Sequence, residues 1–191
     1  MAYLVKDGNE MVFGDPHKFA ILAAPVDEWT DPGSHVNGIF HFIIDGNFLP
    51  EKARVATLGG DAFCFDANHP LISLPEDEGL FNKPPSIAFK NIMEMILPQE
   101  LDPHGNYPPP DERYKASTYN LEDGGSYVFS VCWGDRVRVL GAQVSHQNLD
   151  AEGVLQWEEI MPITIHEVYL SKNEASNIVS GFISNFGIIN A

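Results

Sequence analysis

Short apolar runs bounded by turn residues set the pattern of this chain and predict β-strands. Residues 19–26 and 38–44 are rich in apolar, aromatic and β-branched side chains, as strands usually are. Asp45 and Gly46 follow the second run and are typical of a tight turn into residues 47–49. The sequence therefore predicts an antiparallel hairpin around this turn.

A second hairpin is predicted in the C-terminal half of the chain. Residues 127–133 and 136–143 are strand-like, and Gly134 and Asp135 separate them. Weaker patterns predict further strands at residues 54–58, 62–65 and 163–170.

Alternation within residues 136–143 assigns the faces of that strand. Arg136 and Arg138 alternate with Val137 and Val139. Successive side chains of a strand point to opposite faces, so the arginines share one face and the valines the other. We expect the arginines on a solvated face; a binding site at these arginines is the alternative.

Two segments carry the three- and four-residue spacing of amphipathic helices. Residues 86–97 follow two prolines, with Ser86 as the expected N-cap and Pro98 as the stop. Residues 172–187 follow Ser171, which forms a capping-box pattern with Glu174. Each helix has an apolar stripe that we expect to pack on a sheet.

Together these elements predict an α+β fold with a mainly antiparallel sheet. Hairpins and two separated helices favour it, because the chain lacks the regular strand and helix alternation of a parallel sheet. We expect residues 1–191 to form a single domain, in line with the usual size of domains. A long polar loop is expected at about residues 99–125, either functional or an insertion without a role.

The net charge narrows the classes of partner. The chain has 27 acidic and 11 basic residues, which gives a formal net charge of −16. Such a charge repels phosphate backbones, so direct nucleic-acid binding is not expected, whereas a basic protein would be attracted. Acidity that serves only solubility is the alternative interpretation.

Cysteine use and hydropathy suggest an intracellular protein. Cys64 and Cys132 lie in apolar runs and are expected to be buried, reduced thiols, although a bridge between them stays open. The N-terminus lacks a secretory pattern, and no run approaches about 18 apolar residues. We therefore expect a cytoplasmic protein without a membrane span.

Motifs for catalysis or metal binding are not apparent. The seven histidines lack the spacing of common metal sites, and neither cysteine is in a setting that lowers a thiol pKa. Phosphate-binding loops and nucleophile elbows are also missing from the sequence. The prediction is a protein that is not an enzyme and that needs neither a metal nor a cofactor.

The N-terminal quarter carries a resemblance. Phe-Gly-Asp-Pro at 13–16, Phe-Ala-Ile at 19–21, Val-Asp-Glu-Trp at 26–29 and Asn-Gly-Ile-Phe at 37–40 resemble the opening of bacterial immunity protein family forty-two. This family belongs to polymorphic-toxin and contact-dependent growth inhibition systems, and its members neutralise toxins from competing cells. The resemblance implies that the chain binds the C-terminal toxin domain of a cognate secreted protein stoichiometrically.

Acidic and aromatic loop residues are the predicted contacts with such a toxin. A toxin that acts on nucleic acid is commonly basic, so a basic nuclease domain suits these acids. Tyrosines in the same loops would serve as anchors. The predicted contact residues are Glu76, Asp77, Glu78, Tyr107, Asp111, Glu112, Tyr114, Tyr119, Glu122 and Asp123.

A second hypothesis is a β-rich module that binds a small ligand or carbohydrate without catalysis. Trp29, Trp133 and Trp157 would then offer stacking surfaces, although core or edge packing also accounts for them. An unrecognised hydrolase is a third and weaker hypothesis, because active-site residues can be scattered along a sequence. The sequence leaves the oligomeric state open.

Overall fold

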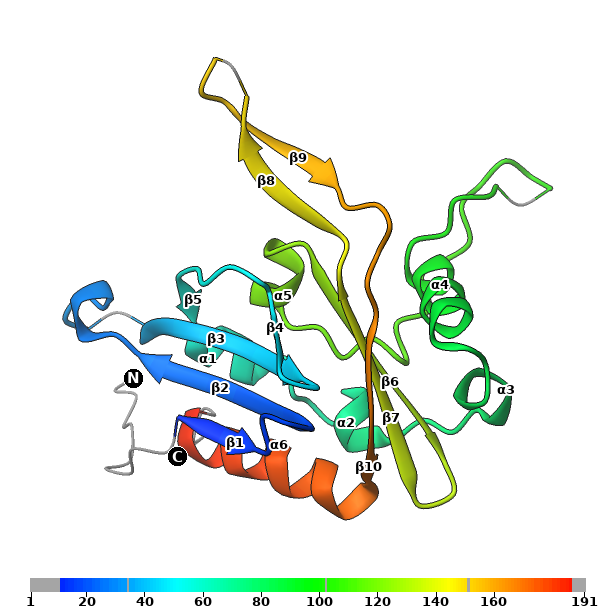
Figure 1. Cartoon of the computed structure of the whole chain (residues 1–191), viewed down its shortest axis with the longest axis horizontal. Helices are drawn as coiled ribbons and strands as arrows, with labels where there is room; N and C mark the ends of the chain where they lie inside the picture. The colour runs from blue at the N-terminus through cyan, green and yellow to red at the C-terminus, as the bar shows by residue number, and fades with distance from the viewer. Residues whose placement is uncertain (1–10, 34, 102, 151, 187–191) are drawn as a thin grey trace.

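The fold combines antiparallel sheets with helices, as the sequence predicts. The computed structural model describes residues 11–186 apart from residues 34, 102 and 151 (Figure 1). Its strands are β1 (Val12–Gly14), β2 (Phe19–Pro25), β3 (Asn37–Ile44), β4 (Asn47–Leu49), β5 (Ala56–Thr57), β6 (Ser126–Trp133), β7 (Arg136–Gln143), β8 (Ser145–Leu149), β9 (Leu155–Glu159) and β10 (His166–Ser171). Its helices are α1 (Leu58–Phe63), α2 (Pro70–Ser73), α3 (Glu78–Phe81), α4 (Pro85–Ile96), α5 (Tyr119–Asp123) and α6 (Lys172–Phe186), with a 3₁₀ turn, η1, at Asp27–Trp29.

The first sheet is built around the predicted N-terminal hairpin. Its strands are ordered β1-β2-β3-β4, and β5 pairs with the start of β3. Asp45 and Gly46 make the turn with φ values of 51° and 77°. Positive φ at both central residues is the geometry that matches the twist of a hairpin, which explains the residue types found there.

The second sheet, ordered β10-β7-β6, is covered on both faces. Side chains from Val128, Cys132, Val137 and Val139 join the core beneath the first sheet and α6. On the opposite face, Phe129, Val131, Leu140 and Ala142 form a separate core with α3 and α4. The second sheet therefore lies between the first sheet and these two helices (Figure 1).

Helix α6 closes the larger core with aromatic side chains. The Phe182 ring is 5.4 Å from the rings of Phe40 and Phe65 and 5.9 Å from Phe13, measured between centroids. Its capping box is confirmed: the backbone N–H of Glu174 donates to Ser171 Oγ over 3.2 Å, and Ser171 N–H donates to Glu174 Oε2 over 2.7 Å. Residue 187, the last one predicted for this helix, lies outside the described residues.

Helix α4 confirms the other predicted helix, with one correction. The helix begins at Pro85, and Pro84 rather than Ser86 is the N-cap. Proline suits the first helical position because its fixed φ is already helical and its missing N–H would have no partner there. The prediction of Ser86 as the cap was therefore wrong.

Three other predictions need correction. Residues 62–65 are not a strand: Leu58, Ala62 and Phe65 share a helical spacing, and α1 ends at Phe63. The strand predicted at residues 54–58 shrinks to β5. The polar loop predicted at residues 99–125 ends early, since residues 116–118 are buried and α5 follows them.

Arg138 is not on a solvated face. It is 1% exposed, and its Nη1 donates to the carbonyl oxygens of Leu80 and Phe81 over 2.9 and 2.8 Å. Its Nε donates to Glu167 Oε1 over 2.5 Å. Helix α3 covers this face of the sheet, so the arginine takes the carbonyls at the end of α3 as partners. Arg136, the first residue of β7, is exposed, as predicted.

Candidate functional site

Strands β8 and β9 form a hairpin that projects from the rest of the molecule. Figure 1 shows it extending beyond the two larger sheets, with β8 leaving the end of β7. The two strands pair only with each other, from Ser145 with Glu159 to Leu149 with Leu155. All five residues of β9 are exposed. An isolated two-stranded hairpin is marginally stable at best, so this element depends on its attachment to the body.

One face of the β8–β9 hairpin carries its large apolar side chains, and we call it the apolar face. Leu149, Leu155 and Trp157 share this face with Ser145, Gln147 and Glu159, because cross-strand partners and every second residue point to the same side. Their exposed fractions are 67%, 59% and 50%. Asn148 and Glu158 lie on the opposite face and are joined by a 2.8 Å hydrogen bond. The hairpin thus presents large apolar side chains to solvent on one side and polar groups on the other.

Gln143 fixes the base of the hairpin. Its side-chain oxygen accepts from Ser126 Oγ over 2.7 Å and from Glu51 N–H over 3.1 Å. Its amide nitrogen donates to the carbonyl oxygens of Gly124 and Ser145. This buried side chain therefore ties Glu51 and residues 124–126 to the point where β7 becomes β8.

A glycine pair lets these segments approach each other. Gly125 has a φ of 76°, and a Cβ there would lie 2.2 Å from the carbonyl oxygen of Ser145. A Cβ on Gly124 would lie 2.6 Å from a side-chain carbon of Pro50. Neither site has room for a larger residue, which explains why two glycines follow α5.

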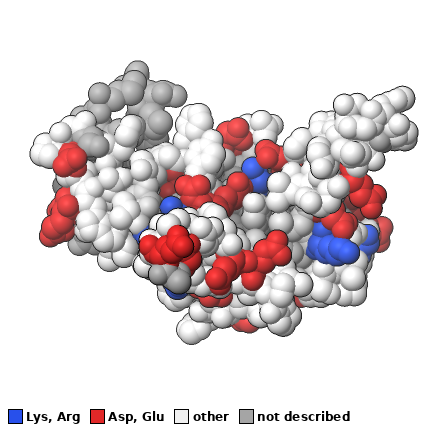
Figure 2. Space-filling view, turned by 90° about the horizontal axis from the view of Figure 1, so that it is seen from above, with Lys and Arg blue, Asp and Glu red and all other residues white. Residues whose placement is uncertain are grey.

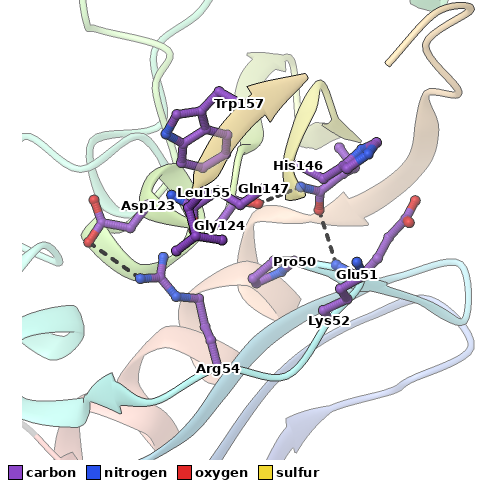
Figure 3. Close-up of a pocket in the computed structure, with 11 residues that line it drawn as sticks. Pro50, Glu51, Lys52, Arg54, Asp123, Gly124, His146, Gln147, Leu155 and Trp157 are labelled. Atoms are coloured by element: carbon purple, nitrogen blue, oxygen red, sulfur yellow. Dashed lines mark hydrogen bonds and ion pairs between the residues drawn. The ribbon is translucent and has the colours of Figure 1, made fainter. Parts of the chain in front are cut away.

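A hollow of about 400 Å³ lies between the hairpin and the body. We call it the hairpin hollow; its lining includes Pro50, Lys52, Arg54, Asp123, Leu155 and Trp157. In Figure 3 the Trp157 indole and Leu155 lie on the hairpin side, and Arg54 lies opposite them. Arg54 and Asp123 form an ion pair of 4.0 Å at one end. The hollow therefore combines an apolar wall with charged groups that remain open to solvent.

Acidic side chains surround this part of the surface. Residues 145–159 contain Asp150, Glu152, Glu158 and Glu159 and no lysine or arginine. Figure 2 looks onto the end that carries the hairpin and shows acidic side chains gathered across the middle of the face. A positively charged protein would be attracted to this face over about 10 Å at ordinary salt.

Two of the sequence-predicted contact residues form hydrogen bonds that stabilise the fold. Tyr114 is 2% exposed, and its hydroxyl donates to Asp77 Oδ2 over 3.2 Å. Asp77 also caps α3, because its Oδ1 accepts from the Leu80 N–H over 2.8 Å. Tyr114 therefore is not a surface anchor, and Asp77 is committed to α3.

Other predicted contact residues are exposed or half-buried and are spread over several places. Asp111 pairs with Arg113, Glu112 and Glu122 pair with Lys115, Asp123 pairs with Arg54, and Glu76 pairs with Lys172. Tyr107 and Tyr119 are exposed, as is Glu78. Only Asp123 lines the hairpin hollow, whereas Glu112, Tyr119 and Glu122 line a second depression beside Phe63.

Sequence reasoning missed the hairpin as a site. Strand β8 reads Ser-His-Gln-Asn-Leu, which has no apolar alternation, and no strand was predicted there. A signal existed in Leu155 and Trp157, two residues apart, after the turn residues Asp150 and Gly153. Trp29, Trp133 and Trp157, considered as stacking surfaces, lie on three separate elements: η1, β6 and β9.

Burial shifts the pKa values of both cysteines and of His69. Both cysteines are free thiols, and burial raises the pKa of Cys64 and of Cys132 to about 11. Burial likewise lowers the pKa of His69 to about 4, and its Nε2 lies 3.2 Å from the Ala116 carbonyl oxygen. Across residues 11–186, leaving out the three that are not described, no cluster of three His, Cys, Asp or Glu side chains could hold a metal ion. Nor is any described helix long and apolar enough to cross a membrane.

Comparisons with known proteins show a shared fold and a family. The chain is similar to the crystal structure of CdiI from Burkholderia dolosa AUO158, with a TM-score of 0.69 and 22% sequence identity. That match covers 91% of this chain and 99% of the other, and it shows a shared fold. A search of curated proteins found no match. The model of the family described as Immunity protein 42 matches residues 11–185, so the chain belongs to the Immunity protein 42 family.

Proposed function

We propose that this protein neutralises a toxin by binding it, without catalysing a reaction. The observation that carries the proposal is the match of residues 11–185 to the Immunity protein 42 family. The similar fold of a protein named CdiI supports the same reading. The partner would be the C-terminal toxin domain of the secreted protein encoded beside this gene, met in the cytoplasm of the producing cell.

The charge of the chain suggests the kind of toxin. A formal net charge of −16 favours a basic partner and disfavours direct contact with nucleic acid. Enzymes that act on nucleic acid need basic surfaces to hold phosphates, so a nuclease domain is the proposed target. Electrostatic steering can raise association rates to about 10⁸ to 10⁹ per molar per second at low salt, which favours capture before the toxin acts.

The predicted loop contacts that remain accessible are part of the proposal. Glu112, Tyr119 and Glu122 lie around one depression together with the exposed Phe63. Glu112 and Glu122 flank Lys115, which would reduce the field they present to a partner. These residues would steer more weakly than Glu152 and Glu159 of the hairpin, which have no lysine or arginine beside them in the sequence.

Titration of toxin activity tests the proposal. The toxin domain is assayed on nucleic acid while the purified chain is added in known amounts. Stoichiometric neutralisation predicts a linear fall in activity that ends at one chain per toxin, together with protection of cells that express both proteins. Undiminished activity at a large excess of the chain would refute it.

A further inference from the structure

We propose that the toxin docks on the apolar face of the β8–β9 hairpin, with Trp157 as its central anchor and a basic toxin surface against the surrounding acids. This inference rests on the proposed function and names the surface that performs it. It differs from the loop contacts that the sequence predicts.

Within the described structure, the apolar side chains of the hairpin are left largely exposed to solvent. Leu149, Leu155 and Trp157 are each at least half exposed, and Val154 at the turn is 51% exposed. Scattered apolar side chains are common on surfaces, but contiguous groups on one face mark interaction sites. None of these residues belongs to either buried core, so core packing does not account for their apolar side chains.

The arrangement of charges matches the anatomy of a protein interface. Interfaces have an apolar centre, often with tryptophan, and a polar rim. Here Trp157 and Leu155 are central, Glu152 lies near the tip and Glu159 at the base. The hairpin hollow beside them can accept side chains that reach past Trp157 towards Arg54 and Asp123.

The same charges argue for a basic partner rather than a second copy of this chain. Residues 145–159 contain no lysine or arginine; Glu159 shares the face of Trp157, and Asp150 and Glu152 lie at the tip, so two copies meeting through this face would bring like charges together. Like-charge contacts suppress such pairing, whereas lysine and arginine side chains of a toxin would be complementary to them.

The anchoring of the hairpin supports a binding role. Gln143 and the Gly124 and Gly125 pair hold its base at a defined position on the body. A site on a fixed element loses less conformational entropy on binding than one on a loose loop. The projection of the hairpin, visible in Figure 1, also lets a partner contact both it and the hairpin hollow.

The chain provides a matched control on η1. Trp29 is 40% exposed, and Asp27 and Glu28 precede it, so η1 also combines one exposed tryptophan with two exposed acids. It lies far from the hairpin in Figure 1. Changes on η1 alter charge and aromatic exposure as hairpin changes do, but outside the proposed interface.

The apolar test compares L155A/W157A with W29A in surface-plasmon binding to the toxin domain. The hairpin variant is expected to weaken binding by about 100-fold, mostly through faster dissociation, and W29A by less than about 2-fold. Circular dichroism and urea midpoints should match the wild type, because all three side chains are exposed.

The charge test compares E152K/E159K with D27K/E28K. The hairpin pair should slow association about 10-fold at low salt, with the difference shrinking at high salt, while the η1 pair should have a much smaller effect. Asp150 is left unchanged because its side chain accepts from the backbone N–H groups of Glu152 and Val154 at the tip.

Each outcome separates the inference from the proposed function. If the wild-type chain fails to bind the toxin, both fall. If it binds and L155A/W157A binds equally well, only the docking inference falls. Loss of binding in F63A/Y119A instead would place the interface at the predicted loops. Light scattering that shows a dimer converted to a monomer by L155A/W157A would also overturn the inference, because the face would then join two copies.

Discussion

Replacing Arg138 tests whether the second sheet depends on a buried charge. Its guanidinium donates to two carbonyl oxygens of α3 and to Glu167, all within 2.9 Å. The R138M variant replaces the guanidinium side chain with an apolar one of similar length and so removes these donors. Among the described residues, Glu167 would then keep the Tyr169 hydroxyl, 2.9 Å away, as its hydrogen-bond partner.

The expected cost is about 3–5 kcal/mol of unfolding free energy. Breaking a buried ion pair from one side costs this amount, because the remaining charge is left without compensation. Glu167 is 24% exposed at its side chain and so recovers part of its solvation, which places the expected loss towards the lower end. Against a typical total of about 5–15 kcal/mol, this loss should be obvious in an equilibrium experiment.

Two further variants separate charge from packing. R136M makes the same change two residues earlier, where the guanidinium is exposed and lies 4.4 Å from the centre of the Tyr169 ring. Its loss should be about 0.5–1 kcal/mol. In R138M/E167Q the unpaired carboxylate is absent, so the double variant should recover about 1 kcal/mol or more relative to R138M.

Urea unfolding followed by tryptophan fluorescence and circular dichroism provides the assay, with coincident transitions as the check of two-state behaviour. Equal losses in R138M and R136M would refute the reasoning, since the buried and exposed arginines would then contribute alike. A loss below about 1 kcal/mol in R138M would do the same.

Three other variants have defined outcomes in the same assay. Burial raises the pKa of Asp61 from 3.8 to about 6, so the native state loses stability as pH rises through this window. D61N should be about 2–3 kcal/mol more stable than wild type at pH 8 and equal to it near pH 4. The absence of this pH dependence would contradict the raised pKa of Asp61. The hydrogen bond from Lys18 and those from Ser171 lower the pKa of Glu174 to about 2. E174Q should therefore cost up to about 1 kcal/mol of unfolding free energy at neutral pH, after allowance for the exposure of Glu174, and this cost should vanish as pH falls from 4.5 towards 2. A cost that does not change with pH would disprove this prediction. G141A should cost about 1–3 kcal/mol, because a Cβ there would lie 2.5 Å from the Ile44 side chain between the two sheets, and unchanged stability would mean that the core yields freely.

The sequence predicted elements whose signals are local. The Asp45 and Gly46 turn needs positive φ at both residues, and the Ser171 and Glu174 capping box satisfies backbone donors within one turn. Such features depend on neighbouring residues, so a pattern of a few positions is enough to find them.

Arg138 shows where local patterns stop being informative. Alternation in β7 correctly separates arginines from valines, but it does not reveal that α3 covers the arginine face. One-turn helices were missed for a related reason: α2, α3 and α5 hold four or five residues each, too few to display a helical period. Burial depends on elements that lie far apart in the sequence.

The predicted contact residues show the same limit for the site. They were predicted as loop residues, yet Glu78 begins α3, and Tyr119, Glu122 and Asp123 lie in α5. Tyr114 is buried, and several acids have basic neighbours. The β8–β9 hairpin was not predicted because β8 is polar and its pairing with β9 replaces contact with a larger sheet. Exposure, which decides what can bind, comes from the assembled fold.

A calorimetric titration of the wild-type chain with the toxin domain, at low and at high salt, would decide whether the chain neutralises the toxin by binding it. We expect a one-to-one complex with nanomolar or tighter affinity that weakens as salt rises, because the chain with its charge of −16 would meet a basic partner. No detectable heat of binding and no co-purification at either salt concentration would contradict toxin neutralisation by this chain.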